Sequence, residues 1–460
     1  MKVGGPVTGG SHGWPFGGPG LDLAEYGYVQ EEYFLEGTAS RFAPAPGSVL
    51  GWDGRWMVEP VGRSPYRTRI LVVRPADPGA FSGTLLVFWN NVSAGYENIG
   101  GGESAEIFEG GYAYVAVTAQ RVGVHGAPRN PQGLQAWDPE RYGSLSIPSD
   151  DYSYDIFTQA ATAVSPGRPS AGVDPLGGLE VRRLIATGGS QSAARLATYV
   201  NAIQSTAQIF DAFLLLLYFG GGAPLEVGEA VMTVELAASD VTSPRIPEGV
   251  HLLRDDLDIP VMIVNTECEA LSYYVVRQPD TDCYRYWEVA GASHVSMQGI
   301  RSSAPRLQRD FGFSMPIDED TMGGINQVSV APVVDAALHH LDHWLRDGIV
   351  PPAPPLIAFE GQRPAVVRDV DGIARGGIRL PSVEVPVAHN SAIQKSSDVF
   401  ARLMGSHEPF SAERLHELYP TREEYLERFE QAAHAAEAAA VILPRDVEAM
   451  VEEARATCPL

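Results

Sequence analysis

A strand-like run that passes through a glycine turn directly into a helix-like run is the most informative part of this sequence. It reads Arg183-Leu184-Ile185-Ala186-Thr187-Gly188-Gly189-Ser190-Gln191-Ser192-Ala193-Ala194. A sharp strand-to-helix turn admits only small side chains two residues before and two residues after its central serine. Gly188 and Ser192 meet that requirement around Ser190. The pattern is typical of a nucleophile elbow, which presents a serine Oγ at the edge of a sheet.

The helix that follows the turn could supply part of an oxyanion site. Backbone N–H groups at a helix N-terminus point toward anions, so we expect the N–H of Gln191 to face a developing oxyanion beside Ser190. A simpler interpretation remains, in which Ser190 or Ser192 only caps the helix. The use of Ser192 where a second glycine is usual also departs from the commonest form of the motif.

Two glutamates follow the second predicted strand after the serine turn. The run from Pro260 to Val264 is apolar, and Glu267 and Glu269 come just after it. In the chain order of a serine elbow in an α/β sheet, the acid that orients the histidine comes at this place. We expect Glu269 to be that acid, with Glu267 as the alternative.

A histidine follows the last predicted core strand. The run from Tyr284 to Val289 leads into a loop of small residues that ends at His294, 25 residues after Glu269. One helix and one strand fill such a gap. Taken alone, His294 would pass for an ordinary loop histidine, but serine, acid and histidine occur in the expected order. The sequence therefore predicts a Ser190–His294–Glu269 triad.

The loop after the strand-like run at 83–89 is the expected source of a second oxyanion donor. It begins Asn90-Asn91-Val92-Ser93. We expect the N–H of Asn91 to be the donor and Asn90 to shape the loop. Two asparagines in an ordinary turn are the alternative.

Strand-like and helix-like segments alternate along the chain, which favours an α/β fold with a mainly parallel central sheet flanked by helices. The segments 120–150 and 220–258 interrupt this alternation, and we expect them to be lid or cap insertions. Residues 350–460 carry apolar segments and no clean linker precedes them, so we expect a C-terminal extension packed on the core of one elaborated domain, 1–460.

Composition excludes several classes of function. The chain has 460 residues and a net charge of −24, so it repels nucleic acid and anionic lipid and favours neutral or cationic substrates. No apolar run is long enough to span a membrane and no secretory signal is recognisable at Met1, so we expect a soluble, cytoplasmic protein. His339 and His343 have a metal-compatible spacing, but we interpret their helix as structural and expect no metal and no cofactor.

Several stretches spread over the chain carry a resemblance to a known family. They are Trp89-Asn90-Asn91-Val92-Ser93, Ala119-Gln120-Arg121-Val122-Gly123-Val124, Asp138-Pro139-Glu140-Arg141-Tyr142-Gly143, Gly189-Ser190-Gln191-Ser192, Trp287-Glu288-Val289-Ala290-Gly291 and Gly376-Gly377-Ile378-Arg379-Leu380-Pro381. With them the sequence resembles the α/β-hydrolase superfamily and, within it, the mostly uncharacterised bacterial "alpha/beta hydrolase domain" proteins. The resemblance implies the α/β-hydrolase fold and an extension that is integral to it, but says little about the substrate.

A serine nucleophile indicates acyl transfer, so the expected activity is hydrolysis of a carboxylic ester or lactone through an acyl-enzyme. The expected substrate is a small, neutral, ester-like molecule. Two other functions stay open. The same triad could pass the acyl group to an acceptor other than water, or the chain could be a non-catalytic binding protein of the same fold.

Overall fold

The computed structural model describes residues 1–127, 131–168, 172–228, 249–312, 324–362, 364–394, 396 and 399–460. Within them, a nine-stranded central sheet has the order β1-β2-β3-β5-β4-β6-β7-β8-β9. The strands are β1 Lys2–Gly4, β2 Tyr28–Pro44, β3 Val58–Pro75, β4 Thr84–Trp89, β5 Ala113–Val117, β6 Arg183–Gly189, β7 Ala212–Leu216, β8 Val261–Thr266 and β9 Tyr284–Val289. From β5 to β9 all neighbours are parallel, which confirms the expected mainly parallel sheet.

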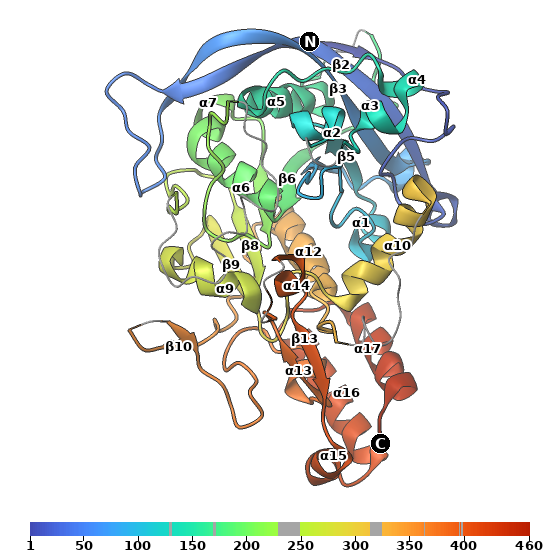
Figure 1. Ribbon diagram of the computed structural model, residues 1–460, viewed down its shortest axis with the longest axis vertical. Coiled ribbons are helices and arrows are strands. Elements are labelled where there is room, and N and C mark those ends of the chain that lie inside the picture. The colour runs from blue at the N-terminus through green and yellow to red at the C-terminus, as the bar shows by residue number, and fades with distance from the viewer. Residues whose placement is uncertain are drawn as a thin grey trace.

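The antiparallel part of the sheet is a long hairpin made of β2 and β3, which runs across the top of the molecule in Figure 1. Its register shifts between Ser40 and Arg41, as at a β-bulge, and bulges increase the local twist. The inner end of β3 pairs with β5 from Ile70 to Val73, so the hairpin is continuous with the parallel strands.

Helices cover both faces of the parallel strands, because strands that are apolar on both faces must be buried on both. The helices α5 (Ser153–Val164) and α6 (Gln191–Thr198) contribute to the apolar cluster on one face. The helices α1 (Ala105–Glu109) and α12 (Ala331–Asp347) contribute to the cluster on the other.

The first predicted insertion, 120–150, is not the long loop that its composition suggests. Its described residues include three short helices, namely α2 Arg121–His125, α3 Leu134–Trp137 and α4 Pro139–Tyr142. Asp138 caps α4 by accepting from Arg141 N–H, so a polar residue followed by proline starts a helix here. Residues 128–130 of this segment and 229–248 of the second predicted insertion lie outside the described residues.

Shorter elements connect the sheet strands. They are η1 Leu23–Tyr26, η2 Pro78–Ala80, η3 Asp150–Tyr152, η4 Tyr199–Ile203, α7 Gln204–Ala207, α9 Glu267–Tyr273 and η5 Tyr274–Val276. The longer helix α10, Met297–Phe311, follows β9, the last strand of the sheet. The sequence suggests one helix over 192–204, but a π-helical segment, η4, separates α6 from α7.

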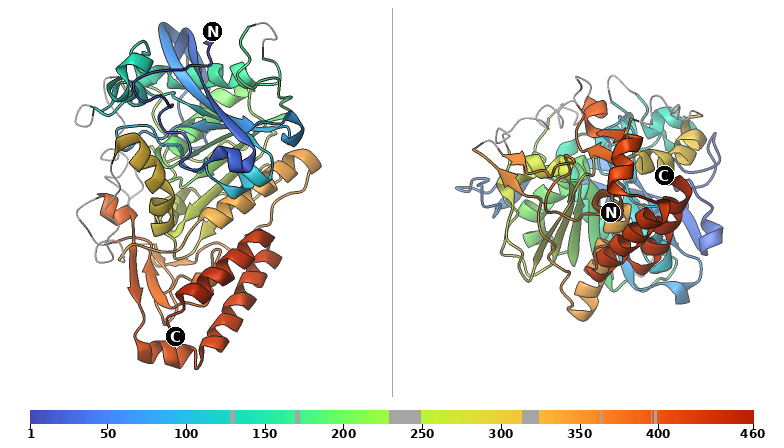
Figure 2. Two further views of the ribbon diagram at one scale, coloured as in Figure 1. Left: turned by 90° about the vertical axis from the view of Figure 1, so that its right-hand side faces the viewer. Right: turned by 90° about the horizontal axis from the view of Figure 1, so that it is seen from below.

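The C-terminal extension packs against the sheet on the α12 face, as expected. Its elements are β10 Phe359–Glu360, β11 Ala365–Val366, α13 Pro381–Glu384, β12 Ala388–Ser391, α14 Val399–Leu403, β13 Ser406–Pro409, α15 Ala412–Leu418, α16 Arg422–Ala438 and α17 Pro444–Thr457. Figure 2 shows α16 and α17 as a pair of helices at the lower end of the molecule. One apolar cluster contains Met262 and Trp287 of the sheet together with Phe429 and Val451 of this pair.

No helix in the described part of the chain combines the length and the apolar character that crossing a bilayer requires.

Candidate active site

Ser190 occupies a strained backbone conformation between β6 and α6. Its φ is 60° and its ψ is −119°, which non-glycine residues rarely adopt and which marks functional turns. Its N–H donates to the Leu216 carbonyl of β7 at 2.9 Å, so the neighbouring strand holds the turn. The side chain of Ser190 makes no capping hydrogen bond, which removes the simpler interpretation of this residue as a helix cap.

The small residues around the turn are needed for steric reasons. A Cβ added to Gly188 would lie 2.9 Å from the Cβ of Ser192 and 3.3 Å from Leu196 Cδ1. Both distances are shorter than ordinary carbon contacts. The first turn of α6 therefore passes directly against the end of β6, as the sequence pattern predicts.

The structure brings His294 to Glu269. The ring Nδ1 of His294 lies 2.7 Å from Glu269 Oε1, and the exposed fractions of the two side chains are 8% and 0%. The other carboxylate oxygen, Oε2, accepts from the backbone N–H and the hydroxyl of Thr266, at 2.8 and 2.6 Å. Glu269 therefore serves two purposes, because it closes the N-terminal capping box of α9 and orients the imidazole.

Glu267, the alternative acid, is turned to other partners. Its Oε2 accepts from Gly291 N–H at 2.8 Å, and its Oε1 accepts from Arg368 Nη2 at 2.5 Å. It is buried, with 1% of its side chain exposed. Of the two glutamates in the first turn of α9, only Glu269 contacts the His294 ring.

Each of the three predicted triad residues follows a parallel strand of the sheet. Ser190 comes after β6, Glu269 after β8 and His294 after β9, and the carboxyl ends of parallel strands share one edge. Phe219, which follows β7, stacks on the His294 ring with centroids 5.2 Å apart. No hydrogen bond joins Ser190 Oγ to His294 within the described residues, although such contacts are often long in enzymes without a substrate.

The two predicted oxyanion donors differ in availability. Gln191 is the first residue of α6, so its N–H has no acceptor within the helix. The N–H of Asn91 instead donates to the Asn98 carbonyl at 2.9 Å, in a two-residue bridge that closes the loop. The expected role of Asn91 would require this bridge to open.

Asn90 has the unused polar atoms in this loop. It is 1% exposed, and neither Nδ2 nor Oδ1 has a hydrogen-bond partner among the described residues. The neighbouring Asn91 side chain donates to the Gly189 carbonyl at 3.0 Å, which places the start of this loop against the turn that holds Ser190. Buried amides are rarely left unpaired, so the Asn90 side chain has unused hydrogen-bonding capacity.

The sequence did not predict a network of hydrogen bonds around Gln120, which lies next to the Ser190 turn. Gln120 Oε1 accepts from both Trp89 Nε1 and Gln191 Nε2, each at 3.0 Å. Gln120 Nε2 donates to Asp150, which also accepts from Arg195 of α6 at 3.0 Å. Gln120 lies in one of the stretches that carry the family resemblance, but nothing local in the sequence indicates its partners.

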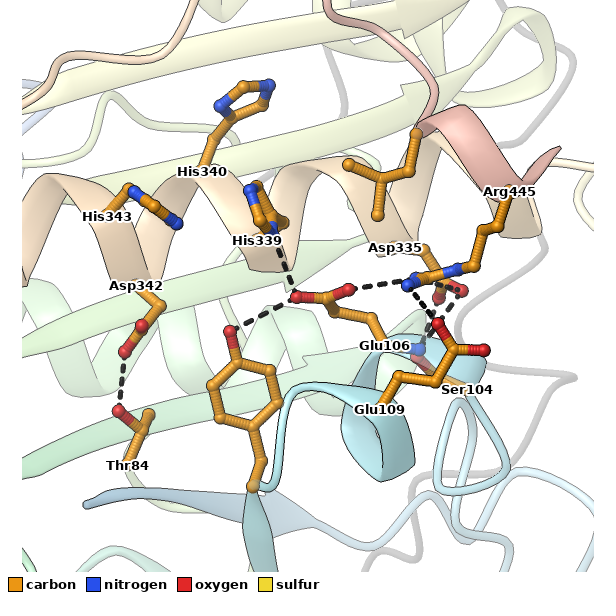
Figure 3. A network of polar contacts seen from close by, with 12 residues as sticks. Thr84, Ser104, Glu106, Glu109, Asp335, His339, His340, Asp342, His343 and Arg445 are labelled. Carbon is orange, nitrogen blue, oxygen red and sulfur yellow. Dashed lines mark hydrogen bonds and ion pairs between the residues drawn. The ribbon is translucent and has the colours of Figure 1, made fainter. Parts of the chain in front are cut away.

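His339 and His343 on α12 each lie beside charged side chains. His339 Nδ1 lies 3.0 Å from Glu106 Oε1, and the same carboxylate accepts from Tyr112 and Arg445 (Figure 3). His343 lies beside Asp347 and Arg346 on its own helix. In the part of the chain that the structure describes, no three histidine, cysteine or acidic residues are arranged to hold a metal ion.

Comparison with solved structures finds hydrolases of low identity. They include the esterase Est22, at 14% identity over 62% of this chain and 77% of that one, with a TM-score of 0.30. A hyperthermophilic esterase from the archaeon Pyrobaculum calidifontis has 14% identity over 55% and 74%, with a TM-score of 0.25. XC6422 from Xanthomonas campestris, an α/β serine hydrolase without a lid, has 11% identity over 48% and 78%, with a TM-score of 0.28. Such low scores say nothing of this chain's substrate.

No curated protein matches this sequence. The model of the alpha/beta hydrolase domain family matches residues 3–452, which is nearly the whole chain and includes most of the C-terminal extension. The strand order, the strained serine turn and the extension thus occur within a single family match, and the chain belongs to the alpha/beta hydrolase domain family.

Proposed function

We propose that this protein is a serine hydrolase that cleaves a carboxylic ester or a lactone, with Ser190 as nucleophile, His294 as general base and Glu269 as the acid that orients it. The observation that carries the proposal is the strained Ser190 turn, at the same sheet edge as a buried His294–Glu269 pair. The net charge of −24 favours a neutral substrate over an anionic one.

The geometry supports the following sequence of steps. With Nδ1 of His294 donating to Glu269, Nε2 carries the lone pair that can take the proton of Ser190 Oγ. Ser190 then attacks the substrate carbonyl, and His294 protonates the leaving alcohol. Water, activated in turn by His294, releases the acid from the acyl-enzyme and restores Ser190.

The oxyanion of the tetrahedral intermediate needs two donors. The N–H of Gln191 is the first. For the second we favour the amide Nδ2 of Asn90, because it is buried and unpaired, whereas the N–H of Asn91 is held by Asn98. Asn90→Leu should then lower kcat by about 10²-fold, the usual cost of losing one such donor. Asn91→Ala keeps its backbone N–H and should lower kcat far less, so the assignment of Asn90 Nδ2 rests on the loss in Asn90→Leu.

The direct test is intact-mass measurement after treatment with a fluorophosphonate probe, beside hydrolysis of p-nitrophenyl acetate. We expect a single adduct on the parent protein and on Ser302→Ala, a control at an exposed serine of α10. We expect no adduct and no turnover with Ser190→Ala. Labelling that persists in Ser190→Ala would show that another residue is the reactive nucleophile. A folded parent that neither labels nor turns over would support a binding protein instead.

Hydrolysis and acyl transfer are separated by the products. With an added alcohol as acceptor, a hydrolase releases mainly the free acid, whereas an acyltransferase releases mainly the new ester.

A further inference from the structure

The loop that carries His294, residues 290–296, and the first residue of α10 are held mainly by segments that follow them in the chain. The Asn326 side chain donates to the Gly291 carbonyl at 2.7 Å. Backbone hydrogen bonds link the loop to the C-terminal extension and to residue 326, namely Ala290 N to Ile378 O, Val295 N to Leu403 O and Met297 N to Asn326 O, each at 2.9 Å. The position of His294 therefore depends on residues well outside the sheet.

One side-chain contact joins this loop to a charge on the extension. Glu267, at the start of α9, accepts from Gly291 N–H in the loop and from Arg368 of the extension. Arg368 lies 101 residues from Glu267 in sequence and keeps 36% of its side chain exposed, whereas Glu267 is buried. Arg368 Nη1 also donates to the Gly372 carbonyl at 3.0 Å, and this hydrogen bond fixes the guanidinium on the extension.

We propose that Glu267 and Arg368 are a positioning pair for the hydrolase reaction proposed above, in which Glu267 fixes the His294 loop and Arg368 balances its charge. The inference rests on the proposed function, because it concerns the same histidine. It makes the C-terminal extension a working part of the active site, since the charge that balances Glu267 comes from it.

The physical reason is electrostatic. Glu267 is a second buried carboxylate two residues from Glu269, and buried carboxylates without a cation are costly. If Arg368 were absent, the extra negative charge would stabilise the protonated imidazole of His294, which is inactive as a base. A hydrolase that needs neutral His294 would then lose activity at higher pH than the parent.

The groups that face His294 and Glu267 are few in the described part of the chain. From α9 they are Glu269 and the thiol of Cys268, whose pKa is raised well above its usual value by burial, so that it stays neutral. From the extension there is Arg368, and from the segment after β7 there is the uncharged ring of Phe219. Changes at Glu267 and Arg368 should therefore dominate the local charge balance.

The test is the pH dependence of kcat/KM for p-nitrophenyl acetate in Glu267→Gln, Arg368→Met and the double variant. We expect Arg368→Met to raise the pH at which kcat/KM falls on the acidic side, the acidic limb, by about 0.5–1 unit. Glu267→Gln should lower that pH by a similar amount. The double variant should return the limb to within about 0.3 unit of the parent, because both charges are gone. We expect kcat to fall by about 5- to 30-fold in Arg368→Met, with KM changed less than about threefold.

Two controls give the result its meaning. Arg414→Met removes another partly exposed, ion-paired arginine of the extension, bound to Asp371, and should leave the limb in place. Arg368→Lys keeps the charge and should restore the parent limb. A lower melting temperature in Arg368→Met with an unmoved limb would overturn the proposal and leave only a structural contact.

Failure of this inference and failure of the proposed function are distinguishable. If the parent does not react with the fluorophosphonate probe at Ser190, the proposed function fails. If the parent reacts and turns over but the limb does not move in Arg368→Met, only the positioning role fails. Should Glu267→Gln not fold, Arg368→Met still decides the question, because Arg368 is partly exposed.

Discussion

The molecule contains two histidine–glutamate pairs that look alike when each pair is viewed alone. His294 Nδ1 lies 2.7 Å from Glu269, and His339 Nδ1 lies 3.0 Å from Glu106. Both carboxylates are buried. The pairs differ in what else the glutamate binds and in what lies next to the histidine.

Glu106 is surrounded by donors, as Figure 3 shows. Besides His339, it accepts from Tyr112, and Arg445 of α17 lies 2.9 Å from its second oxygen. Arg445 also bonds Glu109 and Asp335, so this network ties α17 to α1 and α12. An arginine that balances the charge of a carboxylate reduces the net negative charge near the imidazole, so the carboxylate stabilises an imidazolium only weakly.

No such cation contacts Glu269 in the described part of the chain. The second oxygen of Glu269 accepts from the backbone N–H and the hydroxyl of Thr266, and its histidine lies at the sheet edge where the strained Ser190 also lies. The hydroxyls near the other pair are already engaged, since Ser104 bonds Asp335 and Thr84 bonds Asp342 (Figure 3). Within the described residues, the pair that we propose to be catalytic thus differs from the other in two ways: a serine in a strained turn lies at the same sheet edge, and no arginine neutralises its carboxylate.

The largest difference should appear when each glutamate is made neutral. We expect Glu269→Gln to lower kcat/KM by about 10³- to 10⁴-fold, because the imidazole loses both its orientation and the charge that stabilises its cation. Glu106→Gln is the matched control and should stay within about threefold of the parent. Steady-state hydrolysis of p-nitrophenyl acetate measures both. Equal losses in the two variants would abolish the distinction between the pairs.

The second prediction concerns stability, for which Glu106 should matter more than Glu269. Glu106→Gln should lower the free energy of unfolding by about 1–3 kcal/mol. That lies below the usual cost of breaking a buried pair, because Arg445 is 26% exposed and keeps Glu109 and Asp335. Urea unfolding followed by circular dichroism measures it.

A double-mutant cycle with Arg445→Met sharpens this result. If the two side chains interact directly, their effects should not add, and the coupling should be about 0.5–3 kcal/mol. Additive losses would mean that Glu106 stabilises the fold through His339 and Tyr112 alone.

The smallest effect concerns His340, which follows His339 on α12. Burial lowers the pKa of His340, and its Nε2 donates to the Ala440 carbonyl at 2.8 Å. Its other neighbours are the Trp287 ring and the titratable groups of His339, His343 and Glu106.

Because the folded pKa of His340 lies below the unfolded one, the unfolded chain binds more protons as the pH falls. Stability is therefore lost from about pH 6.5 downward, near the unfolded value. His340→Gln keeps a donor for Ala440 and does not titrate. We expect the melting temperature of the parent, relative to this variant, to fall by the order of 1 °C between pH 7.5 and 5.5. An unchanged difference would show that protonation of His340 is not coupled to folding.

Much of the fold was predictable because its signals are local. The apolar runs of β4, β7 and the first four residues of β8 are short and uninterrupted, as expected for strands buried on both faces. The short helices of 121–142 were not predicted, because four- or five-residue helices depend on capping and tertiary contacts more than on periodicity.

The candidate site divides in the same way. Ser190 was recognisable because the steric demands of its turn are written into Gly188 and Ser192. The hydrogen bond from Asn91 N–H to Asn98 and the network through Gln120 and Asp150 were not recognisable. They depend on how loops fold back on themselves, and no local spacing encodes that.

The sequence by itself determined the strand–serine–helix turn, the order of serine, acid and histidine, and the α/β class, because each rests on neighbours in the chain. Only the tertiary structure decided which of Glu267 and Glu269 contacts His294. The two residues are two positions apart in one helical turn and so point about 200° apart. Which side meets His294 and which meets Arg368 depends on where the C-terminal extension packs, and that contact spans 101 residues.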